Sequence, residues 1–437
     1  MFIYYLQLGL RSLKRNPILT TLMIVGIGLG IGASMTTLTV MYLMGSDPIP
    51  WKSDKLHYVQ LDNWNPDKPY DEDGRPPDQI SYRDAMALME AAKADKQTAM
   101  FKTLLMIQPE NPEVKPFEAV IRANYADFFA MFEPPFAYGG AWDRQQDAEH
   151  ARVIVLTHDT NEKLFGGQNS VGKTVRMNGE DYHVVGVLTA WPLRSRYYDL
   201  TLGAFSAFND PDEFFIPFTT GIDLKQYPYG STRCWKSRGD DWDALLQSEC
   251  VWIQMWVQLD SPARLAEYTA FLDNYVQEQK KLGRFPRPLN NRLLNVTQWM
   301  RDQHVIPRDV EVQTWLAFAF LAVCLVNTIG LLLAKFTRKT GEVGVRRALG
   351  ASRRDVFTQF LIESSMVGLS GGLLGLVLTS LGLFVVRTLY TRYQAVAALD
   401  GAMIAMTIVL AIAAALLAGL YPTWRACRVQ PATQLKV

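Results

Sequence analysis

The chain alternates between long apolar runs and long polar stretches, and this partition predicts a membrane protein. Each apolar run is close to or longer than the roughly 20 residues that a helix needs to cross about 30 Å of hydrocarbon. The runs that are nearly free of charge are Ile18–Met44, Trp315–Ala334, Val356–Val386 and Ala402–Leu420. We therefore expect an α-helical membrane protein with four transmembrane helices, at residues 17–45, 313–335, 356–387 and 401–421.

Residues 46–312, between the first and second runs, are polar and rich in aromatic residues. Period-two alternation predicts strands and 3.6-residue periodicity predicts helices. The predicted strands are 55–61, 104–107, 117–121, 152–156, 174–178, 182–188, 214–218 and 251–259, and the predicted helices are 81–93, 124–132, 159–165 and 262–278. This mixture predicts a large α+β domain between the first two membrane helices.

The Lys and Arg residues near the membrane helices predict the orientation of the chain. Short cytoplasmic loops carry an excess of these residues. They cluster before the first run, between the second and third runs, and after the fourth: Arg11, Lys14, Arg15, Lys335, Arg338, Lys339, Arg346, Arg347, Arg353, Arg354, Arg425, Arg428 and Lys436. We therefore expect cytoplasmic termini, a cytoplasmic segment at 336–355, a cytoplasmic tail at 422–437, a short outer loop at 388–400 and an extracytoplasmic domain at 46–312.

The N-terminal segment Met1–Leu13 has apolar and aromatic residues at helical spacing. We expect residues 1–16 to form an amphipathic helix in the cytoplasmic interface. The alternative is an extension of the first membrane helix that breaks at Pro17. The apolar run that follows is longer than the 7–15 residues of a signal-peptide core, so we interpret it as a retained anchor.

Overall composition adds little to this picture. The chain is 49% hydrophobic and 20% charged, and its formal net charge of +1 indicates nothing further about partners. We expect no nucleic-acid partner. Of the four cysteines, Cys324 lies in a membrane run and Cys427 in the tail, whereas Cys234 and Cys250 lie in the extracytoplasmic domain. Disulfides form in oxidising compartments. We therefore predict one disulfide, Cys234–Cys250.

Two short motifs imitate nucleotide-binding sites. Gly167–Thr174 fits G-x-x-x-x-G-K-T, but a phosphate-binding loop needs a preceding strand and a following helix. Here the predicted order is reversed, so we interpret Lys173 as a solvated surface residue. Leu369–Gly372 imitates the signature of ABC ATPases but lies within an apolar run, where it predicts helix packing. The five histidines lack metal-ligand spacing. We predict a non-catalytic chain that holds no metal or cofactor.

Glu363 is an acidic residue inside the third apolar run. Ionisable residues in membrane helices are functional candidates by default. Because Glu363 lies only about two turns from the basic segment, we favour a structural salt bridge with Arg353, Arg354 or Lys335.

Glycines concentrate in the first and third runs, with four-residue spacing at Gly26/Gly30 and Gly368/Gly372. This spacing lets helix backbones approach closely in lipid. Packing within one chain is the favoured interpretation, and a dimer interface is the alternative.

The basic segment Gly341–Arg354, GEVGVRRALGASRR, resembles the E-I/V-G-V-R-R-A-L-G-A signature of FtsX-like and MacB-like ABC transporter permeases. The resemblance continues through Asp355–Ser364. Residues 152–188 resemble the MacB-type periplasmic core, with a strand, a helix, L-F-G-G, V-G-K, N-G and V-V-G-V. The tail YPTWRACRVQPATQLK is also similar. The resemblance departs at Met131–Glu133, where a glycine is usual, and 221–250 resembles an insertion.

This resemblance implies a permease subunit of the bacterial inner membrane, whose partner ABC ATPase subunit binds ATP and Mg²⁺. The ATPase would dock on 336–355, with Met1–Leu13 and the tail contributing. The docking residues it implies are Glu342, Val343, Val345, Arg346, Arg347, Leu349, Gly350 and Ala351. It also implies a dimer with a second copy or a homologous permease, and transmission of the ATP-driven movement to the periplasmic domain.

Three uses of that movement remain open. We favour efflux of a peptide, an antibiotic or another small amphiphile, with a periplasmic adaptor and an outer-membrane channel as further partners. The alternatives are release of lipoproteins from the membrane, and signalling without transport to a cell-wall hydrolase or sensor. A receptor anchored by four membrane helices is the alternative outside the ABC class.

Overall fold

The computed structural model describes residues 16–110, 113–191, 195–201, 207–208, 212–389 and 401–427. The chain divides into two compact units. One is Asp47–Val305, which we call the extramembrane domain. The other joins the segments on either side of it and contains the helix bundle. The predicted interfacial helix Met1–Leu13 lies outside the described residues.

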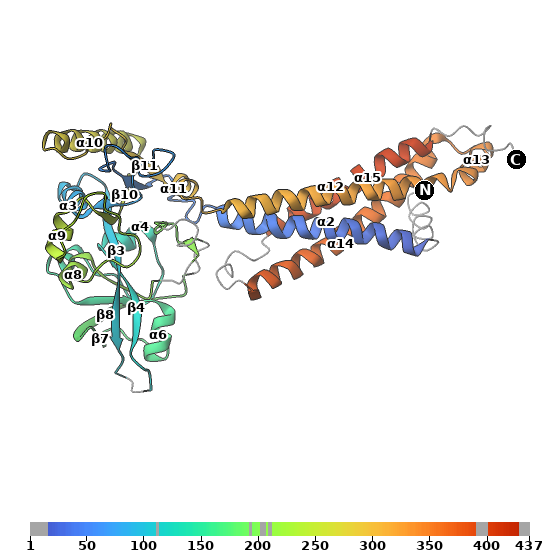
Figure 1. The fold of residues 1–437 in the computed structure, drawn as a ribbon. Helices are drawn as coiled ribbons and strands as arrows, with labels where there is room; N and C mark the ends of the chain where they lie inside the picture. Colours follow the sequence, from blue (N-terminus) through green and yellow to red (C-terminus); the bar gives the residue numbers. More distant parts are fainter. Residues whose placement is uncertain are drawn as a thin grey trace. The chain divides into compact units, whose positions relative to one another are not determined.

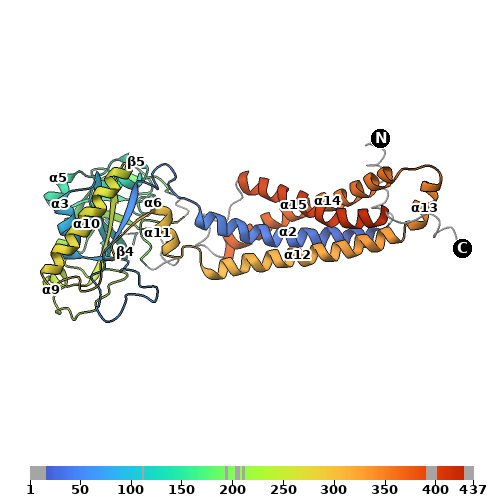
Figure 2. The ribbon, with the colours of Figure 1, turned by 90° about the horizontal axis from the view of Figure 1, so that it is seen from above.

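Four helices of the bundle are long and apolar enough to cross a membrane, as predicted. They are α2 (Pro17–Gly45), α12 (Arg308–Thr337), α14 (Arg353–Leu389) and α15 (Gly401–Cys427), and Figures 1 and 2 show them side by side. The short helix α13 (Thr340–Ala348) lies between α12 and α14. The predicted boundary at residue 421 is not a helix end, because α15 continues through Pro422 to Cys427.

Small residues let the bundle helices approach closely. A Cβ placed on Gly30 would lie 2.7 Å from a Leu321 methyl carbon of α12. On α14, a Cβ on Gly368 or Gly372 would lie 2.1 or 2.4 Å from the Cβ of an alanine of α15. These three glycines therefore occupy packing positions within the chain. Gly26 does not, because a Cβ there would meet no atom within 4 Å. The packing predicted within the chain is wrong for Gly26.

The described part of the extramembrane domain is built on an eleven-stranded mixed sheet. The strand order is β11-β1-β10-β3-β4-β9-β6-β8-β5, while β2 pairs with β10, and β7 pairs with β3 and β8. The strands are β1 (Leu56–Gln60), β2 (Ile80–Ser81), β3 (Lys96–Gln108), β4 (Phe117–Asn124), β5 (Phe136–Gly139), β6 (Val153–Leu156), β7 (Thr174–Met177), β8 (Glu180–Leu188), β9 (Phe214–Pro217), β10 (Val251–Gln258) and β11 (Arg292–Asn295). Two neighbouring pairs, β4–β9 and β6–β8, are parallel.

Eight helices accompany this sheet in the described residues. They are α3 (Tyr82–Ala91), α4 (Asp127–Phe132), α5 (Arg144–Ala148), α6 (His158–Phe165), α8 (Phe218–Asp223), α9 (Trp242–Gln247), α10 (Pro262–Lys281) and α11 (Val296–Asp302). Figure 2 shows α10 lying across the strands. Serines start two of the predicted helices, because Ser81 and Ser261 accept hydrogen bonds from backbone N–H groups of the first turns of α3 and α10. Such caps satisfy donors that have no partner within the helix.

Strand β10 is buried along its whole length because helices cover both faces of the sheet there. Successive side chains of a strand point to opposite faces. Met255 joins the core cluster that includes Leu88 of α3 and Leu272 of α10. Trp256 lies edge-on to Phe132 of α4, with ring centroids 5.6 Å apart. The largely apolar sequence of this strand therefore reflects burial on two sides.

Two predicted elements have different bounds in the structure. Strand β3 begins at Lys96, well before the predicted start at Leu104. Its first residues, although partly polar, pair through the backbone with β10, and the rest of the strand pairs with β4. Helix α4 begins at Asp127, after the predicted start at Asn124, because Asn124 still pairs with β9. Asn178 and Gly179 form the turn between the paired strands β7 and β8, with φ values of +47° and +86°.

A fully buried arginine fastens the segment between β8 and β9 to the sheet. Arg122 of β4 lies 2.6 Å from carboxylate oxygens of both Asp199 and Asp212, and its third nitrogen donates to Gln254 of β10. Lys102 of β3 also lies 2.6 Å from Asp199. Burial would raise the pKa of each aspartate, but these cations hold both pKa values below their usual range. We call these five residues the Arg122 cluster.

Candidate functional site

Helix α13 is the short basic element that the sequence marks as the functional segment. It follows directly from the end of α12 and is followed by a turn at Gly350, whose φ is +101°. Glycine adopts this conformation at no steric cost. Beyond the turn, the Ser352 hydroxyl accepts a hydrogen bond from the Asp355 backbone N–H, and the Asp355 carboxylate accepts one from the Ser352 N–H. These two bonds fix the start of α14. Helix α13 is therefore connected to the end of α12 on one side and to this capped helix start on the other.

One face of α13 is attached to α14. The residues on this face, Lys339, Val343 and Arg346, follow the four- and three-residue spacing that brings side chains to the same side of a helix. Arg346 donates a hydrogen bond to Gln359 at 2.9 Å. Val343 is buried in an apolar cluster that also contains Phe360. We call these contacts the inner face of α13.

Glu363 is the charged anchor of this arrangement. Its side chain has no solvent exposure, and its carboxylate lies 2.6 Å from the ammonium group of Lys335 and 3.2 Å from that of Lys339. Lys335 belongs to the last turn of α12, and Lys339 immediately precedes α13. A buried ion of this kind is costly unless it is paired. We call Glu363, Lys335 and Lys339 the Glu363 clasp.

The salt bridge predicted for Glu363 is confirmed with Lys335, one of the three alternative partners, and the structure adds Lys339. Lys335 was predicted, but Arg353 and Arg354 are exposed and Lys339 takes their place. The reason is helical geometry: Glu363 faces the end of α12, whereas the two arginines lie in the first turn of α14. Lys339 could have been found by noting that 335 and 339 are one helical turn apart.

The other face of α13 is open. Leu349 is 83% exposed and Val345 is 51% exposed, although both are apolar. Glu342 and Arg346 form an ion pair at 2.7 Å, and the side chains of both are partly exposed. We call Glu342, Val345 and Leu349 the outer face of α13.

The other predicted docking residues are placed as follows. Gly350 is exposed in the turn, and Arg347 and Ala351 are partly buried. Val343 was predicted as a docking residue, and it lies on the inner face with 9% of its surface accessible. In the predicted docking tail, residues 428–437 lie outside the described residues, and Trp424 is about half exposed at the end of α15.

The motif that imitates a phosphate-binding loop has the reversed context that its sequence predicts. Helix α6 precedes it and strand β7 begins at Thr174. The Lys173 ammonium lies 4.9 Å from the centroid of the Phe165 ring. The element that follows the loop is strand β7, so the loop does not lead into the N-terminus of a helix. The second imitation lies within α14, where Cβ atoms on Gly371 and Gly372 would contact Ile27 and Ala411. Among the described residues, no group of three or more His, Cys, Asp or Glu side chains is placed to hold a metal ion.

Cys234 and Cys250 are joined in the structure, with a sulfur–sulfur distance of 2.01 Å. The pair ties the segment before α9 to the start of β10, next to a backbone bridge between Arg233 and Val251. Closing a loop of this length stabilises a fold by about 3 kcal/mol in the chain-entropy model. Peptide mapping without reductant tests whether both thiols are oxidised in the purified protein.

Comparison with known proteins finds two family models that together match most of the chain. A family model described as MacB-like periplasmic core domain matches residues 20–275, and one described as FtsX-like permease C-terminal matches residues 315–431. The pyoverdine export ATP-binding/permease protein PvdT of Pseudomonas entomophila is 26% identical over 63% of this chain and 37% of that protein. The macrolide export ATP-binding/permease protein MacB of Chlorobium phaeobacteroides is 23% identical over 68% of this chain and 40% of that protein.

The chain thus spans about two fifths of the length of these curated relatives. Among solved structures, the periplasmic region of MacB from Actinobacillus actinomycetemcomitans is 13% identical. It covers 59% of this chain and 96% of its own, with a TM-score of 0.37, which is too low to establish a shared fold.

Proposed function

This chain belongs to the family of MacB-like and FtsX-like ABC transporter permeases, and on that premise we propose that it is the membrane subunit of an exporter. An ABC ATPase on a separate subunit would bind ATP and Mg²⁺ and dock on α13. The protein would lie in the inner membrane with both termini in the cytoplasm and the extramembrane domain in the periplasm. It would work as a dimer with a second permease copy or a homologous permease.

The observation that carries this proposal is the division of α13 into two faces. The inner face is attached to the bundle through Val343, Arg346 and the Glu363 clasp. The outer face leaves Leu349 and Val345 exposed. Burying a leucine that was exposed is worth about 1.5–3 kcal/mol. A partner that covers the outer face would therefore gain affinity from Leu349 while it pushes on a helix that is already fixed to the membrane part.

The clasp suggests the route of the force. A displacement of α13 would reach α12 through Lys335 and α14 through Glu363, because all three elements meet at one carboxylate. Helix α14 is packed against α2 through Gly371 and Gly375, which contact Ile27 and Ile31. Interfaces this tight transmit displacement because packed groups resist compression. The movement would then pass along the helices towards the extramembrane domain.

Export is the use that the relatives favour, because PvdT is named for pyoverdine export and MacB for macrolide export. We therefore propose that this chain takes part in efflux of a peptide, an antibiotic or another small amphiphile. A periplasmic adaptor and an outer-membrane channel would complete the pathway. Purification of the chain with its bound proteins tests this assembly, and recovery of a cell-wall hydrolase in place of an adaptor would favour signalling.

The docking proposal is tested with Leu349→Asp and Glu342→Lys in the reconstituted complex. Each change alters the outer face and leaves the membrane helices intact. We expect normal insertion and dimerisation but loss of ATPase stimulation by the permease. Leu282→Asp is the matched control, because Leu282 is similarly exposed at 73% but belongs to the extramembrane domain. Full stimulation by both α13 variants would show that the ATPase docks elsewhere.

A further inference from the structure

Asn327 is a polar side chain inside the apolar part of membrane helix α12. It lies seven residues before Ala334, where the apolar run ends, a distance of about 10 Å at 1.5 Å per residue. The side chain is exposed, and its amide has no hydrogen-bond partner among the described residues. In a membrane this amide would face hydrocarbon, which offers no hydrogen bond. Polar residues placed in this way mark functional contacts by default.

The other amide and charged side chains of the four apolar runs have partners. They are Gln359 and Glu363 of α14. Gln359 accepts a hydrogen bond from Arg346 at 2.9 Å, and Glu363 pairs with Lys335 at 2.6 Å. In these runs, therefore, Asn327 is the one side chain of this kind that the described chain leaves exposed and without a partner.

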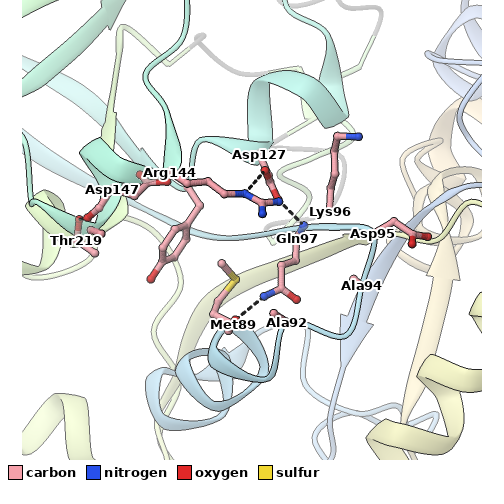
Figure 3. A pocket seen from close by; sticks show the side chains of 12 residues that line it. Met89, Ala92, Ala94, Asp95, Lys96, Gln97, Asp127, Arg144, Asp147 and Thr219 are labelled. Atoms are coloured by element: carbon pink, nitrogen blue, oxygen red, sulfur yellow. Dashed lines mark hydrogen bonds and ion pairs between the residues drawn. The ribbon is translucent and has the colours of Figure 1, made fainter.

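Polar groups of the extramembrane domain are also paired where they surround a cavity. The cavity has a volume of about 400 Å³ and lies beside the end of α3 and the start of β3. In Figure 3, Arg144 binds Asp127, and the Gln97 amide nitrogen donates to the Met89 carbonyl. Because these groups are already bonded within the chain, the cavity does not indicate a ligand, in contrast to Asn327.

Asn327 belongs to a stripe of exposed residues along the outside of α12. Only 22% of the apolar window of α12 is buried, the smallest fraction among the four membrane helices. Successive members of the stripe are alternately four and three residues apart, which is the seven-residue repeat of helices that pack as a left-handed pair. We call the stripe the outer seam of α12, and its members are Leu316, Phe320, Val323, Asn327, Gly330, Ala334 and Thr337.

The outer seam is narrow on the side of Asn327 that leads to the end of the helix. Gly330 and Ala334 are small, and a Cβ placed on Gly330 would meet no atom of the chain within 4 Å. Small residues let helix backbones approach closely in lipid, and side-chain amides form hydrogen bonds between helices there. The seam therefore combines a surface for close approach with one hydrogen-bonding group.

The second helix that fits this seam is α12 of another copy of the chain. Identical chains insert in the same orientation, so two α12 helices would run parallel, with Asn327 at the same depth in both. A carboxamide has both donors and acceptors, so it can pair with itself. A two-fold axis brings the same surface of both copies together. Each Asn327 Nδ2–H could then donate to the Oδ1 of the other copy.

We propose that the outer seam of α12 is the membrane interface of a homodimer, in which the two Asn327 amides are hydrogen-bonded to each other. This inference rests on the proposed function for the pairing of two permeases and names the interface and the partner. It requires neither ATPase docking nor export. The measurements below use the full chain in lipid without the ATPase, so a failure of coupling and a failure of this interface are separate results.

Cross-linking in membranes locates the interface. All variants carry Cys324→Ser and Cys427→Ser, and thiols are oxidised with copper phenanthroline. Val323→Cys on the seam should give a disulfide-linked dimer. Leu373→Cys is the matched control, because Leu373 is 68% exposed on α14 at a similar depth, and it should stay monomeric. Equal cross-linking of both variants, or none at position 323 in a chain that is dimeric, would overturn the interface and leave the proposed pairing of permeases intact.

Dimer affinity measures the contribution of the amide. Energy transfer between labels on Leu282→Cys, an exposed site in the extramembrane domain, reports association as vesicle lipid is increased. Asn327→Leu should weaken the dimer roughly tenfold, the size expected for hydrogen bonding between membrane helices. Asn327→Gln keeps the amide and should retain most of the affinity. Leucine suits hydrocarbon, so insertion should be normal. Unchanged affinity in Asn327→Leu would contradict the proposal.

Two glycines provide a matched pair for the geometry of the interface. A Cβ on Gly330 or on Gly26 of α2 would meet no atom of the chain within 4 Å, but only Gly330 lies on the outer seam. Gly330→Leu should weaken the dimer at least as much as Asn327→Leu, because it separates the two helices, whereas Gly26→Leu should not. Equal weakening by both glycine variants would contradict the seam. Cross-linking of Val323→Cys in native membranes to a homologous permease alone would overturn the second copy as the partner.

Discussion

Both units of this protein bury charged side chains, but an arginine assisted by Lys102 pairs with them in one unit and two lysines do so in the other. In the extramembrane domain, Arg122 holds Asp199 and Asp212 through the separate nitrogens of one planar group. In the bundle, Glu363 is shared by two lysines from consecutive elements. A guanidinium fixes the geometry of its partners, whereas an ammonium on a flexible stem keeps its charge contact while it moves.

Under the proposed function, this difference would separate a static part from a part that moves. The Arg122 cluster fixes a connecting segment to the middle of a sheet, where nothing in the proposed function requires displacement. The Glu363 clasp lies where α12, α13 and α14 meet, the point at which the proposed stroke enters the bundle. Lysine pairing there would hold the three elements together without setting a single geometry. The following predictions test this contrast, from the largest expected effect to the smallest.

Arg122→Met should destabilise the extramembrane domain by about 3–5 kcal/mol, because it leaves the buried Asp212 carboxylate without its main cation and the buried Asp199 carboxylate with Lys102 only as its close cation. Arg122→Lys should remain clearly destabilised, since one ammonium cannot replace contacts made by three nitrogens. Denaturant unfolding of the full chain, followed by near-ultraviolet circular dichroism, measures the change. Arg152→Met is the control, because Arg152 pairs with Glu180 at the surface and should contribute no more than about 1 kcal/mol. A similar decrease in the free energy of unfolding in Arg122→Met and Arg152→Met would contradict the structural role assigned to the Arg122 cluster.

Glu363→Gln should affect coupling more than folding. It leaves Lys335 and Lys339 without their shared carboxylate, so α13 should lose its fixed position relative to α12. Spin labels at positions 349 and 326, both exposed in the wild type, should show a broader distance distribution, and ATPase stimulation should fall. Glu342→Gln, which removes an exposed carboxylate from α13, should leave the distance distribution unchanged. An unaltered distribution in Glu363→Gln would show that apolar packing alone positions the helix.

Lys173→Ala should have the smallest effect, well under 1 kcal/mol, as ordinary surface substitutions do. Its ammonium contacts only the face of the Phe165 ring in the described structure, in contrast to the buried Lys335. ATP hydrolysis by the reconstituted complex should survive this change and should vanish when the phosphate-binding lysine of the partner ATPase is removed. Loss of hydrolysis in Lys173→Ala, with folding intact, would overturn the assignment of ATP to another subunit.

Local signals in the sequence predicted much of the architecture. Runs of about 20 apolar residues predict membrane helices because hydrocarbon satisfies no backbone polar group outside a helix or closed barrel. Asn178-Gly179 predicts its turn because both residues accept positive φ values. Ser81 and Ser261 mark helix starts for the same kind of local reason. In each case the determinant lies within a few residues of the feature.

The candidate site was predicted in position but not in detail. The basic pattern of 341–354 marks α13, yet it does not show that Val343 faces inwards while Val345 and Leu349 face outwards. That division depends on where Phe360 and Gln359 of α14 lie. Likewise, Gly26 and Gly30 share a helix and a spacing, but only Gly30 meets a neighbouring helix within the chain.

By itself, then, the sequence determined four membrane helices, a mixed α and β domain between the first two, and a short basic helix between the second and third. Periodicity, length and turn chemistry suffice for these because they act over short distances along the chain. Only the tertiary structure decided that Lys339 joins Lys335 on Glu363, that Arg122 gathers two aspartates, and that Gln97 lines a cavity with Asp127 and Asp147. These groupings join residues from separate helices and strands, and a burial penalty that depends on three-dimensional packing determines which charges must meet.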